Sequence, residues 1–136
     1  MQQQPKTVLV VDDEPHILRV VSYKLRGAGY SVLEAGNGEE AWELLQTSDV
    51  DLVLTDQQMP LMTGLELVET MRTLDRTSNV PVLMLTARGF RLERDELARA
   101  DVLAMISKPF SPRLLLRHVE EAIGPADGMQ ERAIAA

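Results

Sequence analysis

Five short apolar runs, each followed by a segment with helical periodicity, organise this chain. The first run, Thr7–Val11, is β-branched and apolar after its first residue, which favours a strand that is buried on both faces. The predicted strands are Thr7–Val11, Ser31–Ala35, Leu52–Thr55, Val82–Thr86 and Val102–Ile106. Alternation of strands and helices requires crossover connections, which place helices on both faces of a parallel sheet. The chain is therefore expected to form an α/β domain.

Capping residues, prolines and glycines mark the ends of the predicted helices. Pro15 and the pair Ser111-Pro112 suit helix starts, Asn37 suits an N-cap, and Gly124-Pro125 suits a helix end. A weaker and more polar helix is predicted over Phe90–Arg99. The residues expected on the apolar faces of the other four helices are Ile17, Val20, Val21 and Leu25; Ala41, Leu44 and Leu45; Leu65, Val68 and Met71; and Leu115, Val119 and Ala122.

Size and composition exclude several classes of function. A length of 136 residues suits one domain, expected over residues 6–123, with residues 124–136 as a flexible tail. A net charge of −7 argues against nucleic acid as a direct partner. The chain has no cysteine, so disulfides and thiolate catalysis are excluded. The sequence shows neither the apolar core of a signal peptide nor a run long enough to span a membrane, and a cytoplasmic location is expected.

Polar residues stand at the end of four predicted strands or within two positions after it. Asp12 and Asp13 follow the first strand, Asp56 the third, and Lys108 the fifth, while Thr86 ends the fourth. The carboxyl ends of parallel strands are where an α/β sheet builds its site. Carboxylates held close together raise at least one pKa unless a cation compensates, and Mg²⁺ suits an oxygen site that must also admit a phosphate.

These residue types fit phosphoryl transfer. Asp56 is the candidate nucleophile, since a carboxylate can form an aspartyl phosphate. Lys108 could neutralise one phosphoryl oxygen, and Thr86 could donate its hydroxyl to another. The sequence thus predicts a magnesium-dependent phosphorylation site in which Asp56, Thr86 and Lys108 act together.

Four sequence strings carry a family resemblance. They are Val10–Pro15 (VVDDEP), Asp56–Pro60 (DQQMP) with Gly64 after it, Leu85–Arg88 (LTAR) and Lys108–Phe110 (KPF). In order and spacing they resemble the receiver domains of bacterial two-component response regulators. The resemblance covers residues 6–123. It implies a flavodoxin-like (βα)5 fold, a doubly wound parallel sheet with strand order 2-1-3-4-5.

The resemblance also implies a role for individual residues. Asp56 would accept the phosphoryl group, and Thr86 would be the switch hydroxyl. Lys108 would contact the phosphate, with a cis peptide bond before Pro109. The magnesium ligands would be Asp12 or Asp13, Asp56 and the backbone carbonyl of Gln58.

The same resemblance implies partners and a mode of action. The phosphoryl donor would be a histidine kinase or a phosphotransfer protein, and a downstream protein target would respond to phosphorylation through changed protein–protein contacts. The chain would act as a stand-alone receiver, without an output domain of its own. It would be a signalling domain rather than an enzyme, catalysing only its own phosphorylation and autodephosphorylation. Whether it dimerises is left open.

The sequence departs from the family pattern at one switch position and has characteristic residues at two others. Met105 stands where the family usually has Tyr or Phe, which affects the coupling of phosphorylation to output. Gln58 and Arg88 lie two residues after Asp56 and Thr86, and we expect them to flank the reaction pocket and set how fast water reaches the acyl phosphate.

Two alternatives compete with a switching receiver. A pseudo-receiver, a binding module that does not switch, is supported by Met105 alone. A phosphohydrolase of the haloacid dehalogenase type would use similar residues. That family places its nucleophile in an Asp-x-Asp string after the first strand, whereas this chain has Asp12-Asp13 there and lacks the length for a substrate cap.

Overall fold

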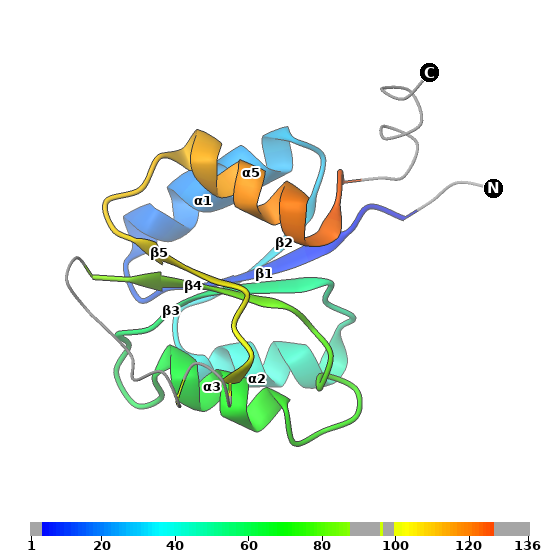
Figure 1. The fold of residues 1–136 in the computed structure, drawn as a ribbon, viewed down its shortest axis with the longest axis vertical. Coiled ribbons are helices and arrows are strands. Elements are labelled where there is room, and N and C mark those ends of the chain that lie inside the picture. Colours follow the sequence, from blue (N-terminus) through cyan, green and yellow to red (C-terminus); the bar gives the residue numbers. More distant parts are fainter. Residues whose placement is uncertain (1–3, 88–95, 97–99, 127–136) are drawn as a thin grey trace.

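The sheet of this protein is parallel throughout and covered by helices on both faces (Figure 1). The computed structural model describes residues 4–87, 96 and 100–126. The strands are β1 (Thr7–Val11), β2 (Ser31–Ala35), β3 (Leu52–Asp56), β4 (Val82–Thr86) and β5 (Ala104–Ser107). Their order is β2-β1-β3-β4-β5, which confirms the predicted flavodoxin-like order.

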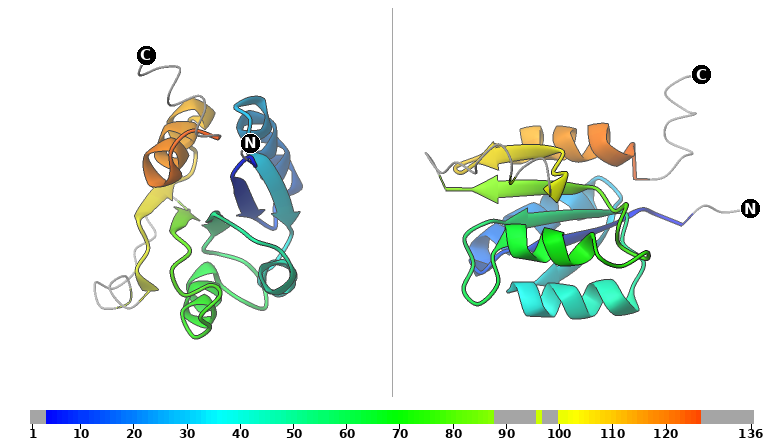
Figure 2. Two further views of the ribbon diagram at one scale, coloured as in Figure 1. Left: turned by 90° about the vertical axis from the view of Figure 1, so that its right-hand side faces the viewer. Right: turned by 60° about the horizontal axis from the view of Figure 1, so that its bottom comes forward.

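The described helices form two layers, one on each face of the sheet (Figure 2). They are α1 (Pro15–Gly27), α2 (Gly38–Thr47), α3 (Gly64–Met71) and α5 (Pro112–Ile123). Helices α1 and α5 cover one face, and α2 and α3 cover the other. Apart from Glu96, the helix predicted over residues 90–99 lies outside the described residues. In the described part of the chain, no helix is long and apolar enough to cross a membrane.

Short polar side chains begin three of these helices. The Oδ1 atom of Asn37 accepts a hydrogen bond from the backbone N–H of Glu40 at 2.8 Å. Ser111 caps α5 and is followed by Pro112, as predicted. Thr63 and Glu66 form a reciprocal capping box at α3, which the sequence analysis missed. These caps supply partners for backbone N–H groups that the helix leaves unpaired.

The central strands are buried because apolar side chains cover them from both sides. Every residue of β3 and β4 is buried, and so is β1 from Val8 onward. Because helices cover both faces of the sheet, a ligand can reach the sheet only at the edge where the strands end. Val20 was expected on the core face of α1 but is 46% exposed, because the face of α1 turned to the sheet runs through Val21 and Leu25.

The fifth strand begins two residues later than the predicted Val102–Ile106. Asp101 has a positive φ of 55°, so the chain turns there before it enters the sheet. The guanidinium group of Arg72 holds this turn by donating to the backbone carbonyls of Ala100 and Asp101. As an edge strand, β5 is only partly covered, unlike β3 and β4.

The first three residues of the predicted tail, 124–126, pack against the start of the sheet. The backbone N–H of Lys6 donates to the carbonyl of Ala126 at 2.8 Å, and Ala126 is 2% exposed. The Tyr30 hydroxyl donates to the carbonyl of Gly124 at 2.5 Å. Burial, together with the charge of Glu120, raises the pKa of Tyr30 to about 12. The packed domain therefore extends through Ala126, and the rest of the predicted tail lies outside the described residues.

We expect Tyr30→Phe to lower the free energy of unfolding by about 1 kcal/mol, because it removes the hydrogen bond to Gly124. Tyr23→Phe is the matched control, since Tyr23 is 83% exposed and the chain has no third tyrosine. Urea unfolding of the two variants and the wild type measures the difference. Equal stabilities of the two variants would show that the Tyr30 hydroxyl does not hold the segment after α5.

Candidate functional site

The carboxyl ends of β1, β3, β4 and β5 meet at one edge of the sheet and surround a hollow of about 440 Å³. The hollow is lined by Asp13, Glu14, Asp56, Gln58, Ala87 and Lys108. Asp12, the residue that follows β1, is fully buried with its carboxylate near those of the lining residues, and Thr86 is buried at the end of β4. The structure thus brings Asp13, Asp56, Gln58 and Lys108, four of the predicted site residues, to one hollow. Arg88 lies outside the described residues.

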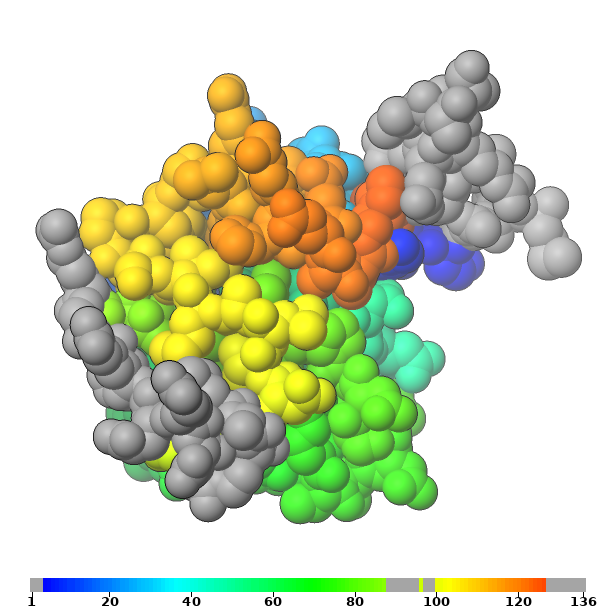
Figure 3. Space-filling model, viewed as in Figure 1, coloured from blue at the N-terminus to red at the C-terminus, as the bar shows by residue number. Residues whose placement is uncertain are grey.

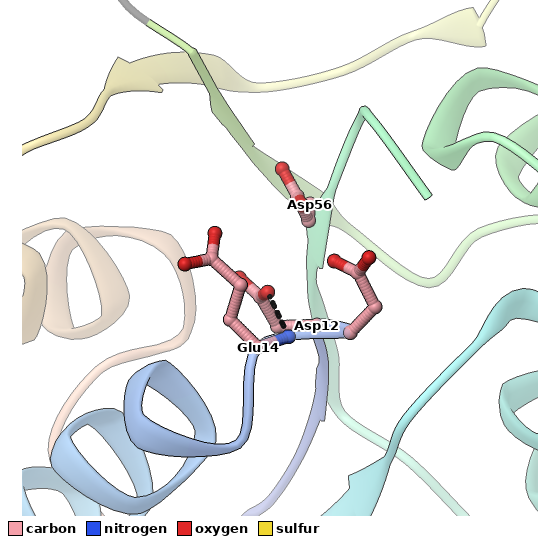
Figure 4. Close-up of side chains that lie close together, drawn as sticks. Asp12, Glu14 and Asp56 are labelled. Carbon is pink, nitrogen blue, oxygen red and sulfur yellow. Dashed lines mark hydrogen bonds between the residues drawn. The ribbon is translucent and has the colours of Figure 1, made fainter. Parts of the chain in front are cut away.

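Four acidic residues converge on this hollow. Asp12, Asp13, Glu14 and Asp56 each offer a carboxylate oxygen, and these oxygens all lie within 4.8 Å of one another. Asp12 and Asp56 are buried, whereas Asp13 and Glu14 are exposed. Figure 4 shows the hydrogen bond from the backbone N–H of Glu14 to Oδ1 of Asp12, at 2.9 Å, which fixes the turn between β1 and α1.

The ammonium group of Lys108 faces three of these carboxylates. Its Nζ atom lies 2.9 Å from Asp12, 3.1 Å from Glu14 and 3.4 Å from Asp56. Burial lowers the pKa of Lys108. The hydrogen bonds to Asp12 and Glu14, together with the charges of Asp12 and Asp56, raise this pKa by more than burial lowers it, so the net shift is upward. The Lys108 backbone N–H donates to the Thr86 carbonyl at 2.7 Å, and the Lys108–Pro109 peptide bond is cis, as expected.

Asp56 lies in surroundings that disfavour its negative charge. Burial, followed by repulsion from Asp12, raises its pKa to about 6. Lys108 and the backbone N–H of Gln58 lower this pKa, but not enough to restore its ordinary value. The Oδ1 atom of Asp56 is buried, and none of the described residues offers it a hydrogen bond. An orphaned carboxylate oxygen among other carboxylates fits a hard divalent cation such as Mg²⁺.

The loop after β3 holds Asp56 through its own backbone. The side-chain oxygen of Gln57 accepts from the N–H of Leu65 at 2.7 Å, and the Gln57 carbonyl accepts from the N–H of Gly64 at 3.0 Å. A Cβ atom at Gly64 would lie 2.4 Å from the backbone oxygen of Asp56. The loop can close on α3 only because this residue has no side chain.

Gln58 connects the loops that follow β3 and β4. Its side-chain oxygen accepts a hydrogen bond from the backbone N–H of Ala87 at 2.9 Å. Gln58 lines the hollow together with Asp56 and Ala87, and its role in the reaction stays a prediction. Met105, the unusual residue at the switch position, lies opposite Met84 in the β4–β5 pairing and is partly buried.

Two residues of the site were missed by the sequence analysis. Glu14 was given no role of its own in the sequence analysis, but its carboxylate contacts Lys108, which is 94 positions away. Gln57 was not assigned, although its side chain is buried and fastens the Asp56 loop. The acidic string at residues 12–14 hinted at Glu14, whereas no local pattern indicated Gln57.

Gly64→Ala is expected to lower the free energy of unfolding by about 1–3 kcal/mol, because the new Cβ overlaps backbone atoms that cannot move aside cheaply. Gly27→Ala is the matched control, since a Cβ there has nothing within 4 Å. Urea unfolding measures both changes. If both variants are as stable as the wild type, the loop at Gly64 has room for a side chain, which would contradict the close contact with the backbone of Asp56.

Asp56→Asn is expected to raise the free energy of unfolding at pH 7 by about 1–3 kcal/mol. The native pKa of about 6 lies above the ordinary value of 3.8, so the native state binds more protons than the unfolded state between these values. Stability therefore falls as the pH rises through this window, and Asn removes that loss. The gain should vanish near pH 4, where Asp56 is protonated in the native protein.

Urea unfolding from pH 4 to pH 8 tests this pH dependence. Asp75→Asn is the matched control, because Asp75 is exposed and lies away from the site. A gain in Asp56→Asn that does not change with pH would contradict a raised pKa for Asp56.

Known proteins resemble this chain in both sequence and structure. The model of the response regulator receiver domain matches residues 8–120. The chain is 38% identical over 123 residues to the chemotaxis protein CheY homolog of Campylobacter jejuni, covering 89% of this chain and 95% of that protein.

Solved structures give the same result. The structure of the chemotaxis response regulator CheY4 of Vibrio cholerae has a TM-score of 0.81 and 34% identity, covering 88% of this chain and 99% of that one. The receiver domain of the sensor histidine kinase PA1611 of Pseudomonas aeruginosa, solved with a magnesium ion in its active site cleft, has a TM-score of 0.79 and 27% identity, covering 88% and 98%. With the family model matching most of its length, the chain belongs to the response regulator receiver domains.

Proposed function

We propose that Asp56 accepts a phosphoryl group, with Mg²⁺, from a histidine kinase or a phosphotransfer protein, and that this modification changes which proteins the domain binds. The observation that carries the proposal is the environment of Asp56. Its Oδ1 atom is buried without a partner, next to the buried carboxylate of Asp12 and within 3.4 Å of the Lys108 ammonium. A carboxylate in this state is available to a cation and to an electrophilic phosphorus atom.

Each group at the strand ends has a place in this reaction. Asp12, Asp13, Asp56 and the backbone carbonyl of Gln58 would supply the oxygen ligands for Mg²⁺. When bound, the cation offsets the negative charge that a phosphoryl group brings to an acidic site. A carboxylate oxygen of Asp56 forms the new O–P bond, and the bond from phosphorus to the donor breaks with its electron pair leaving on the donor.

Lys108 and Thr86 complete the phosphate environment. Lys108 neutralises one phosphoryl oxygen as a compact charge, and the hydroxyl of Thr86, buried at the end of β4, donates to another. Receiver domains are signalling domains rather than classical enzymes, so we assign to this chain only its own phosphorylation and the hydrolysis of its own acyl phosphate. A cytoplasmic location stays a prediction.

The output surface is expected on the side of the molecule that carries β5 and α5. Figure 3 shows this side, with the chain around β5 in yellow beside α5 in orange. Thr86 pairs with Ser107 of β5, so a movement of Thr86 reaches β5 directly. Met105 lies on this route in place of an aromatic ring, and a receiver that binds constitutively without switching is the alternative that this residue favours.

Incubation with acetyl phosphate and Mg²⁺ is expected to add one phosphoryl group to the wild type and none to Asp56→Asn. Intact-mass spectrometry measures the added mass, and a sample with a chelator in excess of Mg²⁺ is the control. A wild-type mass that does not change would contradict the proposal and favour a non-switching binding module. Phosphorylation of Asp56→Asn would show that another residue is the acceptor.

Gln58→Ala is expected to shorten the half-life of the acyl phosphate several-fold. The Gln58 side chain lies across the hollow and holds the N–H of Ala87, so its removal opens the pocket to water. The loss of the added mass over time, after removal of acetyl phosphate, gives the half-life. Gln46→Ala, on the exposed surface of α2, is the control. An unchanged half-life in Gln58→Ala would rule out this role for the Gln58 side chain.

A further inference from the structure

Lys108 is shared among three carboxylates, and the proposed reaction accounts for two of them. Asp56 is the phosphoryl acceptor and Asp12 a magnesium ligand. Glu14, the third, has no part in either role, yet its Oε1 atom lies 3.1 Å from Nζ of Lys108. This distance is shorter than the 3.4 Å between Lys108 and Asp56. Lys108 therefore lies closer to Glu14 than to Asp56, the proposed phosphoryl acceptor.

The three carboxylates differ in how easily they can release Lys108. The side chain of Asp12 is fully buried and that of Asp56 is 4% exposed, whereas that of Glu14 is 47% exposed. Water can solvate the Glu14 carboxylate when the lysine leaves, so breaking this contact costs less than breaking either of the others. Glu14 is thus the partner that an incoming phosphoryl oxygen can most readily replace.

Glu14 is held in a position from which it can reach Lys108. Its backbone N–H donates to Oδ1 of Asp12, which fixes the main chain at the end of β1. It occupies the N-cap position of α1, but its side chain makes no capping hydrogen bond there. The other carboxylate oxygen, Oε2, lies 3.6 Å from Nε2 of His16, which leaves Oε1 to Lys108. The Glu14 side chain therefore pairs with Lys108 and does not cap the helix.

We propose that Glu14 is a positioning residue that occupies the Lys108 ammonium in the unphosphorylated protein, so that a phosphoryl oxygen has to displace Glu14 before it can pair with Lys108, which slows the uptake of a phosphoryl group. The inference rests on the proposed phosphorylation of Asp56. When a carboxylate oxygen of Asp56 bonds to phosphorus and acetate leaves acetyl phosphate with the electron pair of the broken P–O bond, a phosphoryl oxygen takes the place of Glu14 beside the Lys108 ammonium.

The test combines a rate with a direct observation of the lysine. Glu14→Gln removes the charge and keeps the shape of the side chain. Glu39→Gln, at an exposed position in the first turn of α2, removes the same charge outside the hollow and is the control. The rate constant for phosphorylation by acetyl phosphate with Mg²⁺ is measured by intact mass. We expect an increase of about two- to fivefold in Glu14→Gln, which is what a half-exposed ion pair is worth.

Nuclear magnetic resonance of the lysine side chains reports on the contact without any donor. The chain has only three lysines, Lys6, Lys24 and Lys108, and the variant Lys108→Arg identifies the third ammonium signal. In Glu14→Gln this signal is expected to move from its wild-type position toward the position found with beryllofluoride, a phosphoryl mimic, and Mg²⁺. A merely structural role of Glu14 would leave the signal in place.

The possible results separate the inference from the proposed function. Faster phosphorylation of Glu14→Gln than of Glu39→Gln, with a shifted Lys108 signal, supports the inference. Equal rates in the wild type and Glu14→Gln, or an unmoved Lys108 signal, would overturn the inference while the phosphorylated wild type upholds the proposed function. A wild type that takes up no phosphoryl group would overturn both.

Discussion

The charge balance around Lys108 is the interaction on which the rest of the site depends. Asp12 and Asp56 are both buried, and two buried carboxylates side by side are stable only near a compensating positive charge. The Lys108 ammonium lowers the pKa of Asp56, but burial and the charge of Asp12 still leave this pKa raised. The remaining charge makes the strand ends receptive to a divalent cation and then to a phosphoryl group. Four strands that end at one edge of the sheet bring these groups together.

The two layers between the sheet and the helices differ in their methionine content. The layer between the sheet and α2 and α3 contains every methionine that the structure describes: Met59, Met62, Met71, Met84 and Met105. In the described residues, the layer under α1 and α5 is made of valine, leucine and other residues without a methionine. Methionine adapts its shape more readily than branched side chains. The layer against which Met105 packs is therefore the more deformable half of the domain.

The sequence predicted most of the fold because the local signals agreed with the global arrangement. Apolar runs located the strands, Asn37 and Ser111 located helix starts, and the strand ends carried the residues that now surround one hollow. The misses have long-range causes. The late start of β5 depends on a turn held by Arg72, and the packing of Ala126 depends on Lys6 at the other end of the chain. The contact between Glu14 and Lys108 likewise joins distant segments, which no local pattern reveals.

The central claim is that the carboxylates around Asp56 form a site with an excess of negative charge, which Mg²⁺ relieves. The free energy of unfolding, measured as a function of Mg²⁺ concentration, tests this claim most directly. A cation that binds only the native state stabilises it by RT ln(1 + [Mg²⁺]/Kd). The account predicts that the stability of the wild type rises with Mg²⁺ at constant ionic strength, and that the rise is much smaller in Asp56→Asn. A wild-type stability that does not change with Mg²⁺, or an equal rise in both proteins, would contradict it.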